Sequence, residues 1–552
     1  MSRISVLRQD DFTGGLNLRA DQFQLNSNES PKMLNIEIDP RGGVFSRGAM
    51  RRINTTNISA TWNPKSCVPF YGDSSYLMLS TGKYGLTNGN VFWSQGGNFT
   101  PLSVAVTNEA GASFAPWGNK LYIAPGRDTA NMVRWNGATQ TSLTANGGAT
   151  WQNDYDLAVG GHMPRANLAI VHAGKMFVAN TYEGGVPQPN RLRWSHPNKP
   201  EDWAELDRID VTTGGDGITG LASFNGQLLI FKPHAVFALF GFDSDSFQVV
   251  EVSRTVGVSR SHAITTTEYG VYFFSYPDGL FFYDGQRMTD VFEHIRPAIV
   301  NGHVPPVAAE ETYVSYINRR IWVSLPYSDV STVETPSAAF VLDPTIRPRG
   351  TVGSWVMFSV GDGTANYTIN NRHSVTSGCS WIRDDGTIRH VAPHATQPQV
   401  LSVDRYDQNQ DNVTGTDRPF ESSYRTRWLD AGSYSQKKMF RRPDLIVKQV
   451  TDTVNIGIEV YGDYEEAEGS EVKSYSITVP GSSSGFIWGV SGWGQANWGA
   501  ANTGSQIISG RNIGLARSIQ LEFSNVIENV PQSQSWGLNS YTLKYIPRRV
   551  KS

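Results

Sequence analysis

Charged side chains of opposite sign gather in two stretches near the end of the chain. A basic cluster comprises Lys437, Lys438, Arg441 and Arg442. An acidic segment follows it, with Asp463, Glu465, Glu466, Glu468 and Glu471. Clusters of one sign are either solvated faces or contact surfaces, and both interpretations stay open here. Complementary clusters on identical subunits would favour a head-to-tail ring, so we take both as candidates for a subunit interface.

Patterns that resemble catalytic motifs lack the context that their chemistry requires. The segment 481–485 matches the G-x-S-x-G nucleophile pattern, but it lies in a Ser/Gly-rich loop without a strand before a helix. Paired carboxylates could act as acid and base in a propeller hydrolase, and the candidates are Asp278, Asp284, Asp384 and Asp385. Their positions next to glycines and between apolar runs are typical of turns. The sequence therefore predicts no enzymatic activity.

Metal-binding patterns are incomplete as well. His390 and His394 are four residues apart, but a proline between them opposes the helix that would align two imidazoles. Asp407 and Asp411 imitate the start of a calcium loop, yet the twelfth position is Arg418 where a bidentate Glu is required. We expect isolated surface histidines, no metal and no other cofactor.

A loop rich in glycine and tryptophan is a further candidate for a partner contact. Its tryptophans are Trp488, Trp493 and Trp498, in a segment without strong periodicity. Exposed tryptophans on such a loop suggest a contact with a protein or a sugar. The surface of a host envelope is one candidate partner for this loop. Tryptophans tucked beneath the loop are the alternative.

The overall composition limits the class of protein. Lys and Arg number 47 against 50 Asp and Glu, a net charge of -3, so any contact with nucleic acid must be local. No apolar run reaches the ~18 residues of a membrane span, and the first residues lack the apolar core of a signal peptide. The two cysteines fit folding in a reducing cytoplasm. We expect a soluble, unsecreted chain.

A loose repeat supplies the elements that must position these residues. With 54 Gly, 28 Pro and 15 Trp, the composition favours many short strands joined by tight turns. A turn followed by two apolar strands recurs at 117–137, 173–195, 225–241, 269–285 and 318–343. The spacing of about fifty residues is that of a four-stranded blade, so the sequence predicts a β-propeller of six or seven blades. An antiparallel sandwich is the alternative for this stretch. Three tryptophans, Trp135, Trp194 and Trp322, fall at repeated strand positions and are expected to pack between blades.

The predicted organisation is all-β, with three parts. Residues 1–60 read as an extended N-terminal arm that docks on a partner, because little of this stretch alternates long enough to close a sheet. Residues 61–400 form the propeller. The polar stretch 394–420 marks a boundary, and strands that alternate beyond it predict a C-terminal β-sandwich over 401–552.

Several strings, in their order along the chain, resemble the tail nozzle proteins of short-tailed bacteriophages, also called tail tubular protein B, and related phage tail proteins of propeller type. The strings in the first half are Gly14–Asn17, Asn35, Arg47-Gly48, Asn190–Ser195, Trp203, 214–218 and Leu228–Lys232. Those in the second half are Gly257, Tyr272–Phe274, Gly279, Lys437–Pro443 and Ser540–Arg549. Together they cover most of the chain, and their order carries the resemblance.

The resemblance implies a structural protein of the virion tail, assembled in the host cytoplasm. Six copies would form a ring that docks on the tail adaptor below the portal, retains packaged double-stranded DNA and conducts it during ejection. Tail fibre or spike proteins would be further partners. In such a ring the acidic segment would face either the DNA channel or the basic cluster of a neighbouring copy.

A monomeric propeller that binds carbohydrate or cleaves glycosides is the competing interpretation. Its working surface would be the funnel of the propeller instead of a ring interface. The oligomeric state distinguishes the two interpretations, because a monomer at any concentration would favour the carbohydrate-binding class.

Overall fold

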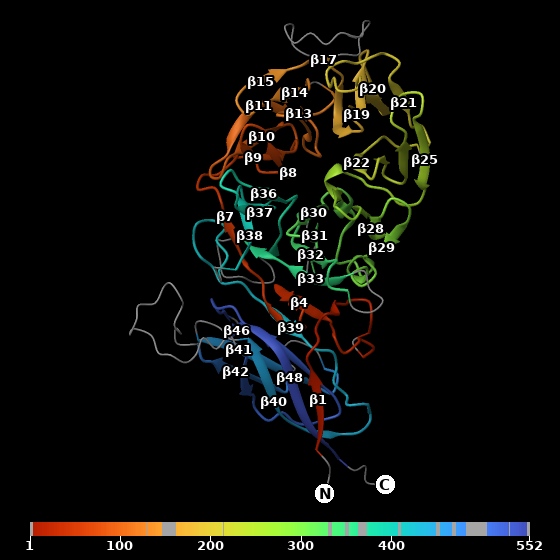
Figure 1. Ribbon diagram of the computed structural model, residues 1–552. Helices are drawn as coiled ribbons and strands as arrows, with labels where there is room; N and C mark the ends of the chain where they lie inside the picture. Colours follow the sequence, from red (N-terminus) through yellow and green to blue (C-terminus); the bar gives the residue numbers. More distant parts are fainter. Residues whose placement is uncertain are drawn as a thin grey trace. The chain divides into compact units, whose positions relative to one another are not determined.

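The computed structural model is nearly all-β and divides into two compact units (Figure 1). The propeller unit comprises residues 51–339 and 373–403, and the sandwich unit comprises 1–50, 340–372 and 404–552. The structure describes residues 4–21, 23–128, 130–145, 162–213, 215–328, 334–347, 353–362, 372–406, 410–448, 453–465, 471–481, 505–528 and 530–548. Helical turns in these ranges are η1 (Ser261–Ala263), α1 (Pro297–Val300) and η2 (Pro306–Ala309).

The propeller unit consists of consecutive antiparallel sheets. Its first three sheets are β8 (Pro64–Tyr71), β9 (Ser75–Thr81), β10 (Gly89–Ser94) and β11 (Thr100–Val106); β12 (Ser113–Trp117), β13 (Lys120–Ala124), β14 (Val133–Trp135) and β15 (Gln140–Ser142); β18 (Arg165–His172), β19 (Lys175–Glu183), β20 (Val186–Trp194) and β21 (Arg208–Asp210). The short β16 (Thr144–Ala145) and β17 (His162–Met163) pair in parallel between the second and third sheets.

The remaining sheets of this unit follow the same plan. They are β22 (Gly220–Phe224), β23 (Gln227–Phe231), β24 (Val236–Phe240) and β25 (Gln248–Ser253); β26 (Ile264–Thr266), β27 (Val271–Ser275), β28 (Gly279–Tyr283) and β29 (Met288–Asp290); β30 (Tyr313–Ile317) and β31 (Arg320–Leu325); β36 (Cys379–Ile382), β37 (Ile388–Pro393) and β38 (Val400–Arg405). Between β31 and β36 the chain leaves this unit along β32 (Ala338–Asp343).

The first strands of these sheets contact one another in a closed ring. The contacts run β8, β12, β18, β22, β26, β30, β36 and back to β8, so seven sheets each contribute an inner strand within the described residues. The predicted β-propeller is therefore confirmed. After β7 (Ala49–Arg52), Ile53 donates its N–H to the carbonyl of Val400 at 2.8 Å, which brings the first residues of the unit beside β38.

Two local features explain why this sequence forms blades. The hairpin from β22 to β23 turns at Asn225 and Gly226, whose φ angles are 47° and 73°. These angles lie in the left-handed region, which glycine and asparagine adopt more readily than other residues. Aromatic side chains then fill the space between blades, and the tryptophans Trp135, Trp194 and Trp322 are all buried as predicted. Full burial of an aromatic side chain contributes roughly 1.5–3 kcal/mol.

The sandwich unit holds two facing sheets. The seven-stranded sheet contains β1 (Ser5–Gln9), β5 (Ile36–Ile38), β6 (Val44–Ser46), β40 (Lys438–Lys448), β43 (Ser505–Ser509), β44 (Gly514–Ala516) and β48 (Gly537–Pro547). The other sheet contains β33 (Ser354–Phe358), β4 (Lys32–Leu34), β39 (Ser423–Arg425), β45 (Ile519–Ser524), β41 (Val454–Gly462) and β42 (Lys473–Val479). Small pairs complete the fold, namely β2 (Gly15–Leu16) with β3 (Glu29–Ser30), β34 (Val360–Gly361) with β35 (Arg372–His373), and β46 (Val526–Ile527) with β47 (Val530–Pro531).

Aromatic rings join the two sheets of the sandwich unit. Phe12 lies between them, with ring centroids 5.1 Å from Tyr424 of β39 and 6.4 Å from Tyr541 of β48. Phe523 of β45 lies 6.0 Å from Tyr541 across the same interior. These side chains are buried, and their contacts form the core of a β-sandwich.

The limits of the units differ from the predicted limits. Residues 1–60 were expected to form an extended docking arm, but β1, β5 and β6 belong to the seven-stranded sheet, and β1 pairs with β48. The sandwich expected over 401–552 also takes strands from 1–50 and 340–372. The physical reason is that these strands are only two to five residues long. In addition, β1 and β6 pair with β48, and β4 pairs with β39, hundreds of residues away, so no local periodicity marks them.

Candidate functional site

The basic cluster lies on β40 of the sandwich unit, and its members have different environments. A register shift between Phe440 and Pro443 marks a β-bulge, which leaves Arg441 and Arg442 exposed. Lys437 is exposed as well. No carboxylate of a described residue lies within 4.0 Å, the limit for an ion pair, of these three side chains.

Lys438 is not a surface cation, which corrects the prediction for this residue. Its side chain is buried and donates from Nζ to the carbonyl oxygens of Ser433 and, at 2.7 Å, Arg517. Burial lowers the pKa of Lys438, while the charges of Asp430 and Asp463 oppose that shift. The alternation of β40 turns Lys438 inward, so it stabilises the unit from within.

The acidic segment is partly used inside the same unit. Asp463 follows β41 and accepts the backbone N–H of Arg517, close to Lys438. Asp463 itself is exposed, and its predicted place at the DNA channel or against a neighbouring copy stays a prediction. Glu465 is exposed. Glu466 and Glu468 lie outside the described residues, as do the tryptophans Trp488, Trp493 and Trp498 of the predicted contact loop.

The outer face of the seven-stranded sheet brings the exposed bases together with apolar side chains. In the register of the sheet, Val6 stands opposite Lys544, and Ile507 stands opposite Ile446. Val6 is 55% exposed and Ile507 is 75% exposed. We call this surface the basic face, and its exposed bases are Lys437, Arg441, Arg442, Lys448, Lys544 and Arg548.

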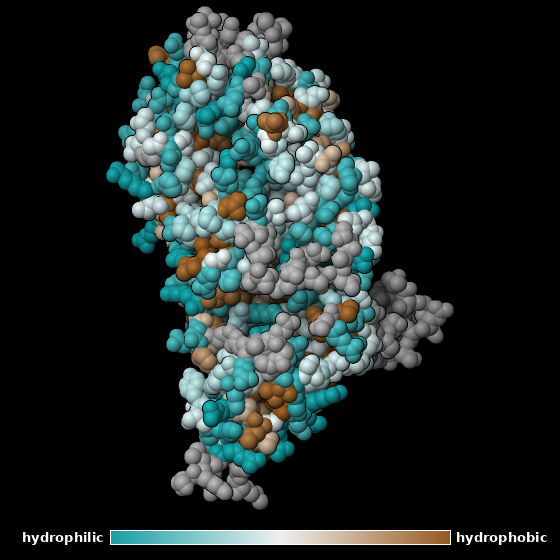
Figure 2. Space-filling view, turned by 180° about the vertical axis from the view of Figure 1, so that it is seen from behind, coloured by the Kyte–Doolittle hydropathy of each residue, from teal (hydrophilic) through white to brown (hydrophobic). Residues whose placement is uncertain are grey.

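Carboxylates offset only part of the charge on the basic face. Lys544 pairs with Asp444 at 2.8 Å, and Lys448 lies 4.4 Å above the ring of Phe45. Figure 2 shows one side of the whole molecule, which is mostly hydrophilic with hydrophobic side chains in small separate groups. Exposed bases without a carboxylate partner, such as Arg441 and Arg442, are complementary to an acidic surface of a protein partner.

A second candidate site lies inside the ring of inner strands of the propeller unit, where ion pairs join blades that are not neighbours. Arg260 precedes β26 and lies 3.1 Å from Glu109, which precedes β12, although these two blades are not neighbours in the ring. Lys65 of β8 pairs with Glu311 at 2.6 Å, again between blades that are not adjacent. We call this set of side chains the ionic plug.

Buried aromatic groups complete the ionic plug. The ring of His262 stacks on Tyr313 with centroids 4.4 Å apart, and the hydroxyl of Tyr313 donates to Glu311 at 2.9 Å. Burial, together with the charge of Lys65, lowers the pKa of His262 to about 3, so this imidazole is neutral. Burial also lowers the pKa of Lys65, although the charge of Glu311 opposes this shift.

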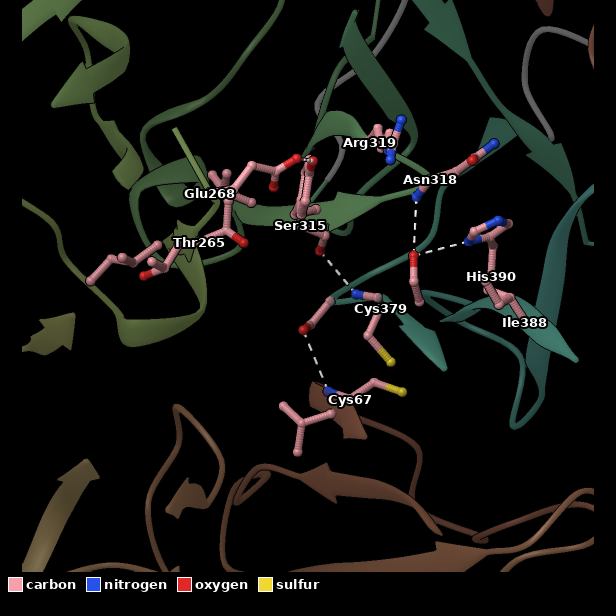
Figure 3. Close-up of a pocket in the computed structure, with 17 residues that line it drawn as sticks. Cys67, Thr265, Glu268, Ser315, Asn318, Arg319, Cys379, Ile388 and His390 are labelled. Atoms are coloured by element: carbon pink, nitrogen blue, oxygen red, sulfur yellow. Dashed lines mark hydrogen bonds between the residues drawn. The ribbon is translucent and has the colours of Figure 1, made fainter. Parts of the chain in front are cut away.

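Beyond the ionic plug, the same inner strands line a cavity of about 800 Å³. Figure 3 shows side chains from four blades around it, among them Glu268, Ser315, Arg319 and His390. Tyr316 donates to Glu268 at 2.7 Å, and burial together with this hydrogen bond raises the pKa of Tyr316. The polar rim and the apolar wall would suit a small polar ligand.

The two histidines of the sequence analysis are half-buried or buried instead of lying on the surface. The Nδ1 atom of His390 is 2.9 Å from the hydroxyl of Ser380, and this hydroxyl accepts the N–H of Asn318 at 3.1 Å (Figure 3). His394 is fully buried, and its Nδ1 accepts the backbone N–H of Gln397 at 2.9 Å. His394 therefore caps a turn. No group of three or more potential metal ligands occurs in the part of the chain that the structure describes.

Two of the four carboxylates considered as acid and base, Asp284 and Asp385, hold turns, as predicted, whereas Asp384 accepts the backbone N–H of Ser75 at 2.7 Å. Asp284 accepts the backbone N–H groups of Gln286 and Arg287, and these bonds lower its pKa. Asp385 accepts from Thr387 in the same way. Asp411, the second aspartate of the calcium-like pattern, is buried and forms an ion pair with Arg47 at 2.6 Å. Its charge is thus neutralised within the sandwich unit.

Some of the strings that carry the resemblance hold the blades together. Arg193 forms two hydrogen bonds to the carboxylate of Glu183, at 2.7 and 2.8 Å, and both residues are buried. Lys232 is buried and donates to the carbonyl of Val211 at 2.6 Å, and Trp203 is fully buried. The ionic plug escaped the sequence analysis, because its members are spread from residue 65 to residue 311 and share no motif.

Comparisons with known proteins leave the family open. No protein-family model and no curated protein matches the chain. Among solved structures, YCF48 bound to D1 peptide covers 63% of this chain and 99% of its own, at 10% identity and a TM-score of 0.32. The computationally designed Ika8 protein covers 64% of this chain and 98% of its own, at 9% identity and a TM-score of 0.34. Within the described residues, no helix combines the length and hydrophobicity needed to cross a bilayer.

Proposed function

We propose that this chain is a structural protein of a short bacteriophage tail, and that several copies, six by the resemblance, form a nozzle ring. The ring docks on the tail adaptor below the portal, contacts fibre or spike proteins, retains packaged DNA and conducts it during ejection. The ordered strings quoted above support this proposal. The structural observation that carries it is the basic face, where Arg441 and Arg442 are exposed without a carboxylate partner and apolar side chains such as Val6 and Ile507 are exposed on the same sheet.

The ionic plug supports a passage between copies instead of through one propeller. Ion pairs that link blades across the ring, as Arg260 with Glu109 does, occupy the space along the axis. The pair of Lys65 with Glu311 crosses the ring in the same way, so no open path for a DNA duplex runs along the axis of one propeller. A conduit for DNA therefore has to be built by the arrangement of several copies.

The charge of the chain agrees with a conduit. Every phosphate that a protein neutralises adds affinity through the release of counterions, and strong binding would slow transit. A net charge of -3 avoids such binding over most of the surface. The exposed bases of the basic face are then better explained by contact with an acidic surface of a protein neighbour.

Assembly of the purified chain tests this proposal. We expect negative-stain images of a ring with a central hole, and a mass in solution that is a multiple of 60.8 kDa. A triple variant, Lys437→Glu, Arg441→Glu and Arg442→Glu, should lose the ring, while Lys438 stays unchanged because it is buried. Reversal of three exposed bases of the propeller unit, Lys199, Arg208 and Arg287, is the control. A strictly monomeric wild-type chain would refute the proposal.

A carbohydrate-binding or glycoside-cleaving propeller is the second candidate function, favoured by the cavity beside the ionic plug. Glu268 and His390 line this cavity, whose volume of about 800 Å³ is large enough for a sugar ring. Binding of oligosaccharides to a monomer, lost in a Glu268→Gln variant, would support this candidate over the nozzle.

A further inference from the structure

The two cysteines of the chain lie together although they are far apart in the sequence. Cys67 belongs to β8 and Cys379 to β36, the inner strands of the first and last blades of the ring. Figure 3 shows both side chains at the wall of the cavity, with their sulfur atoms side by side. No other cysteine occurs in the sequence, so each has one possible intramolecular partner.

Hydrogen bonds fix the backbone on both sides of this pair. Cys67 donates its N–H to the hydroxyl of Ser377 at 3.4 Å, and Gly378 donates its N–H to the hydroxyl of Ser315 at 2.9 Å. The neighbouring thiol of Cys379, together with burial, raises the pKa of Cys67 well above its usual value. Both cysteines are free thiols that belong to the same buried cluster.

We propose that Cys67 and Cys379 form a reversible disulfide that covalently joins the first and last blades. The oxidant is a small-molecule disulfide that enters the cavity, where Cys379 is 8% exposed and Cys67 only 1%. The thiolate of Cys379 attacks this disulfide, forms a mixed disulfide, and releases one small thiol. Cys67 then loses its proton to solvent, attacks the sulfur of Cys379 and releases the second small thiol. Two protein thiols are oxidised and one small disulfide is reduced to two thiols.

The position of the bond gives it a structural consequence. Contacts between β36 and β8 join the two ends of the ring, so a bond between Cys67 and Cys379 links the first and last blades covalently. Such a link prevents these two blades from separating and closes a large loop in the unfolded chain. The oxidised form should therefore unfold more slowly than the reduced form, while the reduced chain keeps the same fold.

Titration of the native full-length chain with 5,5′-dithiobis(2-nitrobenzoic acid) tests the proposal. We expect two equivalents of coloured thiol per chain, no retained adduct, and a peptide map in which the Cys67 and Cys379 peptides are linked until a reductant is added. Release of a single equivalent with a stable adduct would overturn the proposal, because it would show that Cys67 cannot reach the mixed disulfide. No release from the native chain would overturn it too.

Single variants keep the test independent of folding problems. A Cys67→Ser variant should retain one adduct on Cys379, and a Cys379→Ser variant should react slowly or not at all, because Cys67 is the more buried thiol. In the wild-type chain, oxidation should slow unfolding in urea by at least tenfold, and the reductant should reverse this effect. Equal unfolding rates before and after oxidation of the wild type would contradict closure of the ring by this bond.

Discussion

The buried ion pair between Arg47 and Asp411 offers a sharp test of how the sandwich unit is held together. Arg47 donates to both carboxylate oxygens of Asp411, at 2.9 and 2.6 Å. It also donates to the side-chain oxygen of Asn35 at 2.9 Å and to the carbonyl of Ser359 at 2.8 Å. Its guanidinium lies 3.9 Å above the ring of Phe420. The carbonyl of Gly48 accepts the fifth N–H at 2.8 Å, so all donors of this arginine have partners within one unit.

Replacing Asp411 with Asn removes the negative charge but keeps the size of the side chain. The guanidinium then stays buried at 2% exposure without its counterion, and breaking a buried pair in this way costs about 3–5 kcal/mol. For a domain of about 150–250 residues, 1 kcal/mol shifts the melting temperature by roughly 2–4 °C, so we expect a loss of at least about 6 °C. Arg47→Met should cost a similar amount, because several acceptors lose their donor.

Thermal and urea unfolding of the full chain, monitored at Tyr and Trp signals, measures these effects. Arg41 provides the control, because its side chain is 90% exposed and its pair with Asp39 lies on the surface. Arg41→Met should cost no more than about 1 kcal/mol. If Asp411→Asn also costs less than about 1 kcal/mol, water or a rearranged side chain neutralises Arg47 and the reasoning is wrong.

Two further predictions concern the propeller unit. His262 has a pKa of about 3 in the folded chain and near 6.5 when unfolded, so the unfolded state binds the extra proton and stability should fall as the pH drops from about 6.5 toward 3; urea unfolding of His262→Phe across this range should show a shallower decline. A Cβ on Gly257 would lie 2.1 Å from the carbonyl oxygen of Lys232, whereas one on Gly97 would meet nothing within 4 Å. Gly257→Ala should therefore lower the free energy of unfolding by more than about 2 kcal/mol and Gly97→Ala by almost nothing, and equal effects would contradict this account.

The propeller could be predicted from local sequence patterns. The pairing of strands that are far apart in the sequence could not. The turn at Asn225 and Gly226 with apolar strands on both sides marks a hairpin within a few residues, so each blade can be read from its own sequence. The ring then follows because a blade needs neighbours to bury its faces. By contrast, β1 pairs with β48 near the other end of the sequence, and nothing in residues 5–9 indicates that partner.

The basic cluster was predicted only in part, and the ionic plug was not predicted at all. The basic cluster was recognisable from composition, but only the bulge in β40 decides that Arg441 and Arg442 face outward while Lys438 is buried. Charge alone cannot distinguish a surface cation from one that binds backbone carbonyls. The ionic plug was missed because Lys65 and Glu311 become neighbours only when the ring closes.

The assembly of the sandwich unit from three separate segments has a consequence for synthesis on the ribosome. The strand β1 emerges early, but its partner residues Tyr541–Tyr545 are made roughly 500 residues later, which at about 5–20 residues per second is a delay of roughly half a minute or more. The blades from β8 to β29 are continuous in sequence and can form during this interval. A chain that is released early would carry formed blades and an open edge of the seven-stranded sheet, which quality-control proteases and chaperones recognise.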